Sequence, residues 1–268
     1  MSARNLGFIT DSIFHRLNGI IEEKDRYTVI RTPSNPGYFW GNLLYFEKAP
    51  TEGCFELWLE CFREEFGEDC GHVTFAWNED IKGSIEPFIK VGFEWDETVV
   101  LKLAKPIFEF QMNETVDVRP ITTDKEWQAV VDLQIHMSEQ EKTPEFIEFK
   151  EKAFASMRSI QEQGYGAWWG AFLDGKLVGD MGLFFDFETK VGRFQSVETH
   201  PDYQNQRICK TILKSVMTDA IEDKGISDLV IVTEPSNHAL NIYRSCGFVD
   251  HSRQFGFCLR RPYWKQSS

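Results

Sequence analysis

A short polar loop between an expected strand and an expected helix is the part of this sequence best suited to hold an anion. Residues 193–199 alternate in character, as a strand does, and apolar residues recur at helical spacing from Ile208 onward. The first amide groups of a helix have no acceptor within the helix and carry partial positive charge, so they attract anions. The loop 200–207 therefore indicates a phosphate site, although many strand–loop–helix units bind nothing.

The segment Gln204-Asn205-Gln206-Arg207-Ile208-Cys209 resembles the pyrophosphate loop of the GNAT superfamily, the N-acetyltransferases that use acetyl-CoA. That loop runs Arg or Gln, two free positions, Gly, one free position, then Gly or Ala. Gln204 matches, whereas Arg207 and Cys209 stand at the two small positions. Glycine normally lets the backbone approach phosphate, so Arg207 either adds a charged fork or partly blocks the site. The resemblance assigns to the coenzyme Val197, Thr199, Gln204, Asn205, Gln206, Arg207, Ile208, Cys209, Lys210 and Asn237.

The segment 237–248 resembles the second signature of the same superfamily, a helix with Asn, Ala and Tyr that ends in Gly-Phe. By this resemblance Tyr243 is the general acid for the leaving thiolate, and its ordinary pKa of ~10 suits that role. Glu198 is the expected general base, since a carboxylate in an apolar cleft can have a raised pKa. A core tyrosine and a solvated strand glutamate are the plain alternatives. His136 and His200 are further candidates for the base.

The resemblance implies direct transfer of an acetyl group from acetyl-CoA to a primary amine, without a covalent enzyme intermediate. The backbone of residues 197–199 would pair with the pantetheine arm, and one of its N–H groups would polarise the thioester carbonyl. Two alternatives stay open. One is a CoA-binding or scaffold protein that has lost catalysis, which Arg207 motivates, and the other is an acyltransferase that uses a longer acyl-CoA. The acceptor is a small-molecule or peptide amine of unknown identity.

Charge separates the two halves of the chain. The 268 residues carry a net charge of −13, which argues against nucleic acid as a partner. Residues 1–115 hold 11 basic and 20 acidic residues, whereas residues 116–268 hold 18 and 22. A polyanionic nucleotide such as CoA would therefore prefer the second half.

Composition favours a cytoplasmic protein. No apolar run approaches the ~20 residues that cross a membrane, and the N-terminus shows no apolar signal region. The six cysteines have no metal-binding spacing, so we expect free thiols in a reducing compartment and no metal. The oligomeric state is open, with a homodimer among the options.

The pattern of elements predicts an α/β fold with mixed sheets, in two domains. Over residues 116–268 the expected order is strand, two helices, three strands, helix, strand, helix and two strands, which is the GNAT order and covers about residues 116–262. In residues 1–115 we expect a helix over 5–22, a long strand over 38–47, a helix over 52–66 and a connector over 105–114.

Over about twenty residues the two halves align without gaps when one is moved by 155 positions along the other. The pairs that coincide are Glu79 with Glu234, Ile85 with Leu240, Phe88 with Tyr243, and Gly92-Phe93 with Gly247-Phe248. We interpret this as a duplication. The first half then is a degenerate GNAT-like domain without catalysis, because its loop 48–53 lacks the phosphate pattern and Phe88 replaces the tyrosine.

Overall fold

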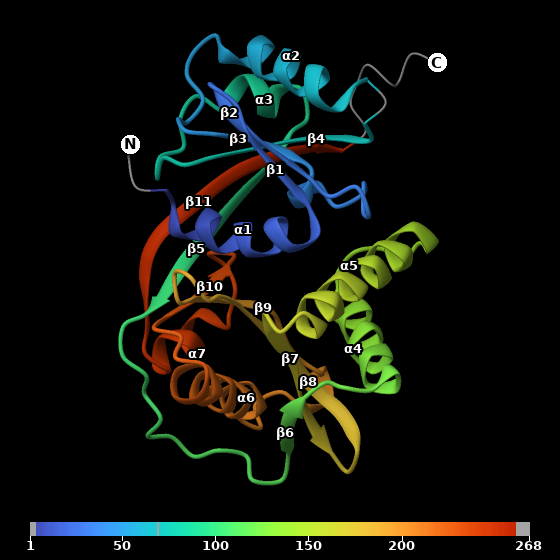
Figure 1. The fold of residues 1–268 in the computed structure, drawn as a ribbon, viewed down its shortest axis with the longest axis vertical. Coiled ribbons are helices and arrows are strands. Elements are labelled where there is room, and N and C mark those ends of the chain that lie inside the picture. Colours follow the sequence, from blue (N-terminus) through green and yellow to red (C-terminus); the bar gives the residue numbers. More distant parts are fainter. Residues whose placement is uncertain (1–3, 69, 261–268) are drawn as a thin grey trace. The chain divides into compact units, whose positions relative to one another are not determined.

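The computed structural model describes residues 4–68 and 70–260, and it has the mixed α/β fold that the sequence predicts (Figure 1). Its internal contacts divide the chain into two compact units, with one division at Val100/Leu101 and a second at His251/Ser252. The predicted domain boundary at 115/116 differs from both. The first unit also contains residues from 252 onward, so a single boundary along the sequence cannot separate the two units.

The first unit contains a helix and a sheet of short strands with two further helices. Its elements are α1 (Leu6–Asn18), β1 (Ile20–Glu23), β2 (Tyr27–Arg31), the 3₁₀ turn η1 (Phe39–Gly41), β3 (Leu43–Phe46), α2 (Cys54–Phe66), β4 (His72–Trp77), α3 (Glu86–Lys90) and most of β5 (Glu94–Leu103). Strands β1, β2 and β3 pair antiparallel, and β3 pairs parallel with β4. The last strand, β11 (Phe248–Arg260), completes this sheet, because its residues 255–260 pair antiparallel with β4.

The second unit begins at the end of β5 and includes the first residues of β11. Its elements are β6 (Asp117–Pro120), α4 (Asp124–Met137), α5 (Pro144–Glu162), β7 (Gly166–Leu173), β8 (Lys176–Asp186), β9 (Val191–Thr199), the 3₁₀ turn η2 (Pro201–Tyr203), α6 (Ile208–Thr218), the π-helical turn η3 (Asp219–Asp223), β10 (Asp228–Thr233) and α7 (Leu240–Ser245). Strands β6 to β9 pair antiparallel in chain order, and β9 pairs parallel with β10.

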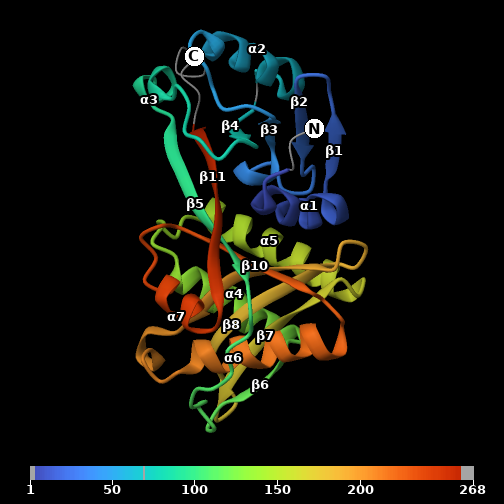
Figure 2. The same ribbon diagram turned by 90° about the vertical axis from the view of Figure 1, so that its left-hand side faces the viewer.

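Helices cover both faces of the second sheet (Figures 1 and 2). Neighbouring residues of β8 show this, because side chains alternate between the faces of a strand. A Cβ atom on Gly179 would lie 3.1 Å from Ile208 of α6, whereas the next residue, Asp180, accepts a hydrogen bond from Gln134 of α4. The sheet therefore separates α6 from α4.

Capping residues lie at the starts of α4 and α5 in the second unit. Thr123 and Glu126 form a capping box at α4, so that each side chain accepts a hydrogen bond from the other residue's backbone N–H. Thr143 caps α5 in the same way, and Pro144 follows at a position that needs no N–H donor. These caps favour the start of each helix at the residue where the structure has it.

Three predicted elements of the sequence analysis are wrong in extent. The helix expected over 5–22 ends at Asn18, because Gly19 is extended and the chain enters β1. The strand expected over 38–47 is reduced to Leu43–Phe46, since Phe39–Gly41 form a 3₁₀ turn. The two expected final strands are one continuous strand, β11, which has residues in both units.

The order and pairing of elements repeat between the two halves. In each half two antiparallel strands are followed by a strand, a helix, a parallel partner strand and a short helix: β1, β2, β3, α2, β4, α3 in one, and β7, β8, β9, α6, β10, α7 in the other. Moving α3 by 155 positions places it on residues 241–245, within α7. In the first half one helix, α1, precedes β1, whereas β6, α4 and α5 precede β7 in the second, so among the described residues the first half is a reduced version of the second.

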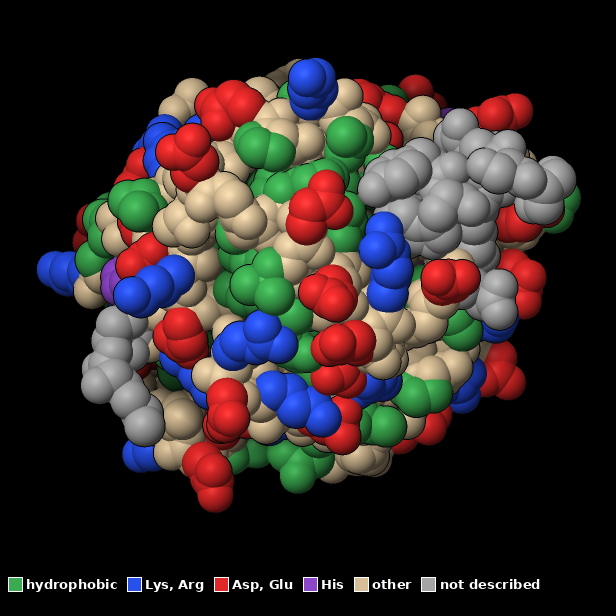
Figure 3. Space-filling model, turned by 90° about the horizontal axis from the view of Figure 1, so that it is seen from above, with side chains coloured by type: hydrophobic (Ala, Val, Ile, Leu, Met, Phe, Trp, Pro, Cys, Tyr) green, Lys and Arg blue, Asp and Glu red, His purple; other side chains and the backbone are tan. Residues whose placement is uncertain are grey.

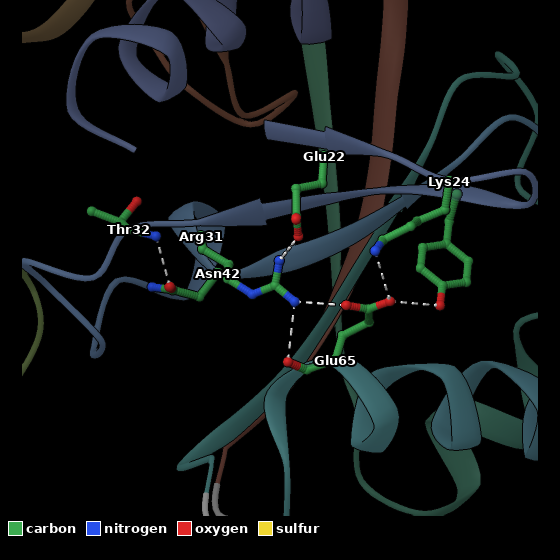
Figure 4. Close-up of polar contacts among 7 residues, drawn as sticks. Glu22, Lys24, Arg31, Thr32, Asn42 and Glu65 are labelled. Carbon is green, nitrogen blue, oxygen red and sulfur yellow. Dashed lines mark hydrogen bonds and ion pairs between the residues drawn. The ribbon is translucent and has the colours of Figure 1, made fainter. Parts of the chain in front are cut away.

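Charged side chains join the β1–β2 hairpin to α2 in the first unit (Figure 4). Arg31 donates to Glu65 of α2 at 2.6 Å and also binds Glu22. The Tyr27 hydroxyl donates to the same Glu65 carboxylate at 3.1 Å, and Lys24 lies 3.9 Å from it. Because Glu65 is satisfied by these partners, this glutamate is part of the fold and not a free surface charge.

The start of α2 is unsuited to an anion. Glu56 lies in its first turn and opposes the positive end of the helix dipole, whereas the first turn of α6 contains no acidic residue. Figure 3 shows the face over α2 and α3, where acidic side chains, with some basic ones among them, border a band of hydrophobic side chains. The difference in charge that the sequence indicates between the halves is therefore also present at the corresponding helix ends.

No helix in the part of the chain that the structure describes has both the length and the apolar character needed to cross a membrane.

Aromatic rings fill the core of the first unit and include residues of β11. Phe257 is fully buried, with ring centroids 4.3 Å from Phe88 and 5.2 Å from Trp77. We expect Phe257→Ala to lower the free energy of unfolding by about 3–5 kcal/mol, because it leaves a cavity among these rings. Urea unfolding measures this loss, and hydrogen exchange should place it in β4. The control is Phe187→Ala, since Phe187 is 46% exposed. A loss as small as that of the control would contradict the assignment of β11 to this core.

Candidate active site

A cavity of about 380 Å³ lies within the second unit, between the end of β9, the start of α6 and the turn before α7. Residues from four separate parts of the sequence line it: the connector before β6, the last residue of α4, residues 197–210, and the segment 237–242 that leads into α7. Its lining residues are Phe110, Gln111, Met137, Val197, Glu198, Thr199, Tyr203, Gln204, Asn205, Arg207, Ile208, Cys209, Lys210, Asn237, His238, Ala239 and Ile242.

The loop at one end of the cavity has the backbone conformation of a glycine-containing turn, although it contains no glycine. Arg207 is the N-cap of α6 and has a φ of 63°, and Asn205 has a φ of 61°. Arg207 has no side-chain capping bond, and its carbonyl already accepts from Thr211 at 3.0 Å. The first amide groups of α6 thus face the loop with no acceptor inside the helix. Arg207 adopts the left-handed backbone conformation that residues other than glycine usually avoid. The turn therefore has the backbone shape that glycine would give it, and it carries a guanidinium group in addition.

The connector before β6 contributes to the cavity, which the sequence analysis did not anticipate. Asn113 donates from its backbone to Thr211 at 2.9 Å and from its side chain to the carbonyl of Gln206 at 2.9 Å. The ammonium group of Lys210 lies 5.3 Å from the centre of the Phe110 ring, a cation–π distance. These contacts hold the connector along α6 and bring Phe110 to the cavity. The sequence offered no periodic signal here, because the segment is neither helix nor strand.

Strand β9 contains one extra residue opposite β8, and this bulge lies beside Glu198. Asp180 is opposite Glu198, whereas Gly182 is opposite Gln195, so β9 uses three steps where β8 uses two. Ser196 has a φ of 45° within the extra step. A bulge of this kind bends a strand and changes the direction of nearby side chains. Glu198 consequently lines the cavity from the central strand of the unit.

Glu198 is half-buried, and burial raises the pKa of its carboxyl group. The positive charge of Lys150 on α5 acts in the opposite direction and lowers that pKa. Burial in turn lowers the pKa of Lys150, while Glu198 and Asp180 raise it. A carboxylate of raised pKa at the edge of a cavity is a stronger base than an exposed one.

Asp180 is a second buried carboxyl group, which sequence reasoning missed. It is fully buried on the face of β8 that α4 covers, and its Oδ1 accepts from Gln134 at 2.7 Å and from the indole N–H of Trp168 at 3.3 Å. Its Oδ2 has no hydrogen-bond partner. Burial raises its pKa well above the ordinary value, and the charge of Glu198 raises it further. An aspartate in a run of hydrophobic strand residues was the available signal, since such a residue is rarely buried without a partner.

Tyr243 lies near the cavity but does not line it. Its side chain is 3% exposed, and burial raises the pKa of its hydroxyl group. Charges on Cys209 and Glu198 raise it as well, which places both groups close to the phenol. Burial also raises the pKa of the Cys209 thiol to about 12. The Tyr243 hydroxyl group and the Cys209 thiol therefore both keep their protons at neutral pH. Of these two residues, Cys209 lines the cavity.

Asn237 lines the cavity and shapes the turn before α7. Its side-chain oxygen accepts from the backbone N–H of Ala239 at 2.8 Å, and its carbonyl accepts from Leu240 at 3.1 Å. The helix predicted over 237–245 begins only at Leu240, because Asn237 forms a local turn that takes up these donors first.

The predicted site residues fall into two groups. Those that the structure brings to the cavity are Val197, Glu198, Thr199, Gln204, Asn205, Arg207, Ile208, Cys209, Lys210 and Asn237. Gln206 and Tyr243 are outside its lining, as are the alternative bases His136 and His200, whose rings stack on each other at 5.4 Å. Gln206 instead offers its carbonyl to Asn113.

All six cysteines are free thiols. Among residues 4–68 and 70–260, no group of three or more His, Cys, Asp or Glu side chains is arranged to hold a metal ion.

We expect Asp180→Asn to stabilise the protein increasingly as pH rises. Burial raises the pKa of Asp180 in the folded protein above its value of ~3.9 in the unfolded chain. The stability that the protonated carboxyl group contributes is therefore complete below pH ~3.9. It is lost as pH rises toward the pKa of Asp180 in the folded protein. Asparagine does not titrate and escapes this loss, while Glu198 and Lys150 are present in both proteins. Urea unfolding at pH 5 and pH 8 measures the difference between variant and wild type, with exposed Asp174→Asn as the control. A difference that does not grow with pH would contradict the burial of a titrating carboxyl at this position.

Residues 127–248 match a known family, described as the acetyltransferase (GNAT) family. No curated protein matches the sequence. A functionally unknown conserved protein from Staphylococcus epidermidis has a similar structure, with a TM-score of 0.77, 13% identity, and coverage of 91% of this chain and 95% of that one.

Two further solved structures are similar to this chain. A GCN5-related N-acetyltransferase from Kribbella flavida has a TM-score of 0.67 and 13% identity, with 96% of each chain covered. A tandem GNAT protein from the clavulanic acid biosynthesis pathway has a TM-score of 0.59 and 10% identity, with 91% of this chain and 84% of that chain covered. At such identities the likeness establishes the fold, and the tandem protein is consistent with the repeat seen in this chain. The family match includes the loop before α6, α6 itself and α7, so residues 127–248 of this chain are similar to the acetyltransferase (GNAT) family.

Proposed function

We propose that this protein transfers the acetyl group of acetyl-CoA to a primary amine. The observation that carries the proposal is the cavity of the GNAT domain, which extends from the left-handed turn at Arg207 to the half-buried carboxylate of Glu198. One end offers helix amides and basic side chains to phosphates, and the other offers a base. A thioester and an amine need both functions within one site.

The residues that would bind the coenzyme fit a polyanion. The amide groups at the start of α6 and the side chains of Arg207 and Lys210 line the same cavity, and no acidic residue lies in the first turn of the helix. Backbone groups of residues 197–199 offer hydrogen bonds to the pantetheine arm, as an added strand would. Bound acetyl-CoA would supply a thioester as the activated acyl donor.

The residues that would move protons are Glu198 and Tyr243. Glu198 accepts a proton from the acceptor's ammonium group, and the free amine then attacks the thioester carbonyl, so that a C–N bond forms and the C–S bond breaks. An N–H group of residues 197–199 stabilises the negative charge that develops on the carbonyl oxygen. Tyr243 keeps its proton at neutral pH and can donate it to the departing thiolate, with a shift of the side chain toward the cavity. The attacking nitrogen gives up its second proton, which restores the Tyr243 hydroxyl group, so that the products are the N-acetylated amine and CoA with a free thiol.

The acceptor and the setting are part of the same proposal. A small-molecule or peptide amine is the expected acceptor, and the net charge of −13 favours a cationic one through steering. The free thiols suit a reducing compartment, so we propose a cytoplasmic location. A longer acyl-CoA donor, or binding without catalysis, are the alternatives that the experiment must separate.

Calorimetry with acetyl-CoA, CoA and a longer acyl-CoA, followed by thiol-release assays over a panel of amines, tests the proposal. Binding of acetyl-CoA with turnover of at least one amine supports it. Absence of binding to every CoA compound would overturn it, and binding without turnover would favour the scaffold alternative. Preference for the longer acyl group would favour the other acyltransferase reading.

Substitutions of Arg207 separate its charge from its backbone conformation. Arg207→Gly and Arg207→Ala both remove a charged fork, so each should weaken acetyl-CoA binding about 5- to 10-fold, a little over 1 kcal/mol. Only glycine relieves the left-handed conformation, so the glycine variant should be about 1 kcal/mol more stable than the alanine variant. Calorimetry and urea unfolding give the two quantities. Unchanged affinity in both variants would make the guanidinium incidental.

Glu198→Gln should lower kcat by about 10²- to 10⁴-fold with little change in acetyl-CoA affinity, because it removes a general base. In the wild type kcat/KM should fall as pH decreases through the raised pKa of Glu198, since the base must be ionised.

Tyr243→Phe should lower kcat more than it lowers the affinity for acetyl-CoA. Steady-state rates between pH 5 and pH 9 measure these effects, and wild-type turnover by either variant would remove that residue from the mechanism.

A further inference from the structure

We propose that Gln134 and Asp180 are positioning residues that lock the bulge of β9, and so direct Glu198 and the backbone of residues 197–199 into the cavity. The inference rests on the proposed acetyl transfer. It adds two residues, on α4 and β8, that do not line the cavity and would act only through β9.

Gln134 joins three elements through one amide group. It is 3% exposed, and its Nε2 donates to Asp180 Oδ1 at 2.7 Å and to the carbonyl of Ser196 at 2.9 Å. A primary amide has two N–H bonds, and each of these contacts uses one. The side chain therefore has one orientation that satisfies both strands, and it ties α4 to β8 and to the bulge of β9.

The bulge of β9 needs the hydrogen bond from Gln134 because its backbone conformation is unfavourable for Ser196. Ser196 has a φ of 45°, a region that costs a non-glycine residue roughly 1–2 kcal/mol. Its carbonyl is held by Gln134, and Glu198 follows two residues later. A relaxed bulge would change the register that places Glu198 opposite Asp180. Since a shift of one residue reverses the direction of every side chain, the lock decides which way Glu198 points.

Asp180 supplies the fixed acceptor of the lock. Gln134 and Trp168 both donate to Oδ1 of Asp180. Trp168 is itself fixed, because a Cβ atom on Gly182 would lie 2.6 Å from its ring, so only glycine leaves room for it. Because both donors bind Oδ1, the lock needs an acceptor oxygen at that position. It does not need the Oδ2 atom or a negative charge on the side chain. The lock should therefore tolerate asparagine at position 180 but not an apolar residue of similar size.

Four variants test this. Gln134→Met and Asp180→Leu remove the donor and the acceptor, Asp180→Asn keeps the acceptor, and Gln128→Met is the matched control on the exposed face of α4. The readouts are kcat, the dissociation constant of acetyl-CoA by calorimetry, and hydrogen–deuterium exchange in peptides covering residues 194–199.

Gln134→Met and Asp180→Leu should lower kcat about 100-fold, the cost of a displaced catalytic group, while acetyl-CoA affinity changes less than about fivefold. Exchange at residues 196–199 should become faster in both. Asp180→Asn and the control should stay within about fivefold of wild-type kcat, with unchanged exchange.

Three results would overturn the proposal. Unchanged exchange in Gln134→Met would mean that this residue does not hold the bulge. Equal losses of kcat in Asp180→Asn and Asp180→Leu would mean that the charge or proton of Asp180 matters, and not its acceptor oxygen. A wild-type kcat in Gln134→Met would mean that the lock does not direct Glu198. Failure of the wild type to bind acetyl-CoA would instead reject the proposed function, and the exchange measurement would still decide whether the lock exists.

Discussion

The pairing of β8 with β9 is the constraint on which the rest of the second unit depends. One extra residue in β9 interrupts an otherwise regular antiparallel ladder, and the interruption falls where the strand meets the cavity. Sheet pairing fixes the direction of each side chain, so the position of this residue determines that Asp180 faces α4 and that Glu198 reaches the cavity. The loop and helix that follow are then placed at the open end of the strand, with their amide groups toward the same space.

Electrostatics explain why the two ends of the cavity differ. Helix amides and the side chains of Arg207 and Lys210 make one end attractive to anions. At the other end burial disfavours the charged forms of Asp180 and Glu198, while Lys150 partly offsets this for both. A carboxyl group that is costly to ionise is also a strong base when it is ionised. The fold thus places an anion-attracting surface and a carboxyl group of raised pKa within one cavity, and the proposed acetyl transfer rests on this combination.

The two halves show how one architecture can keep or lose such a site. Both have a strand, a helix and a parallel partner strand in the same order, and both helices begin after a residue of left-handed conformation, Gly53 in one and Arg207 in the other. In the first unit Glu56 opposes the dipole of its helix, and Phe88, the counterpart of Tyr243, is buried in an aromatic core. Residues from the end of the chain complete that core, which makes the folding of the first unit depend on the last strand.

The sequence by itself determined the helices of the second unit, the strand–loop–helix at 193–218 and most of the residues around the cavity, because these features follow from local spacing, caps and a short motif. It did not determine the contribution of Phe110, since an irregular connector carries no periodic pattern. Nor did it reveal the roles of Asp180 and Gln134, which lie far apart in sequence and meet only when α4 covers β8. Only the tertiary structure decided the bulge of β9, the burial of Tyr243 and the placement of residues 255–260 in the first unit, because strand register and burial depend on partners that are distant along the chain.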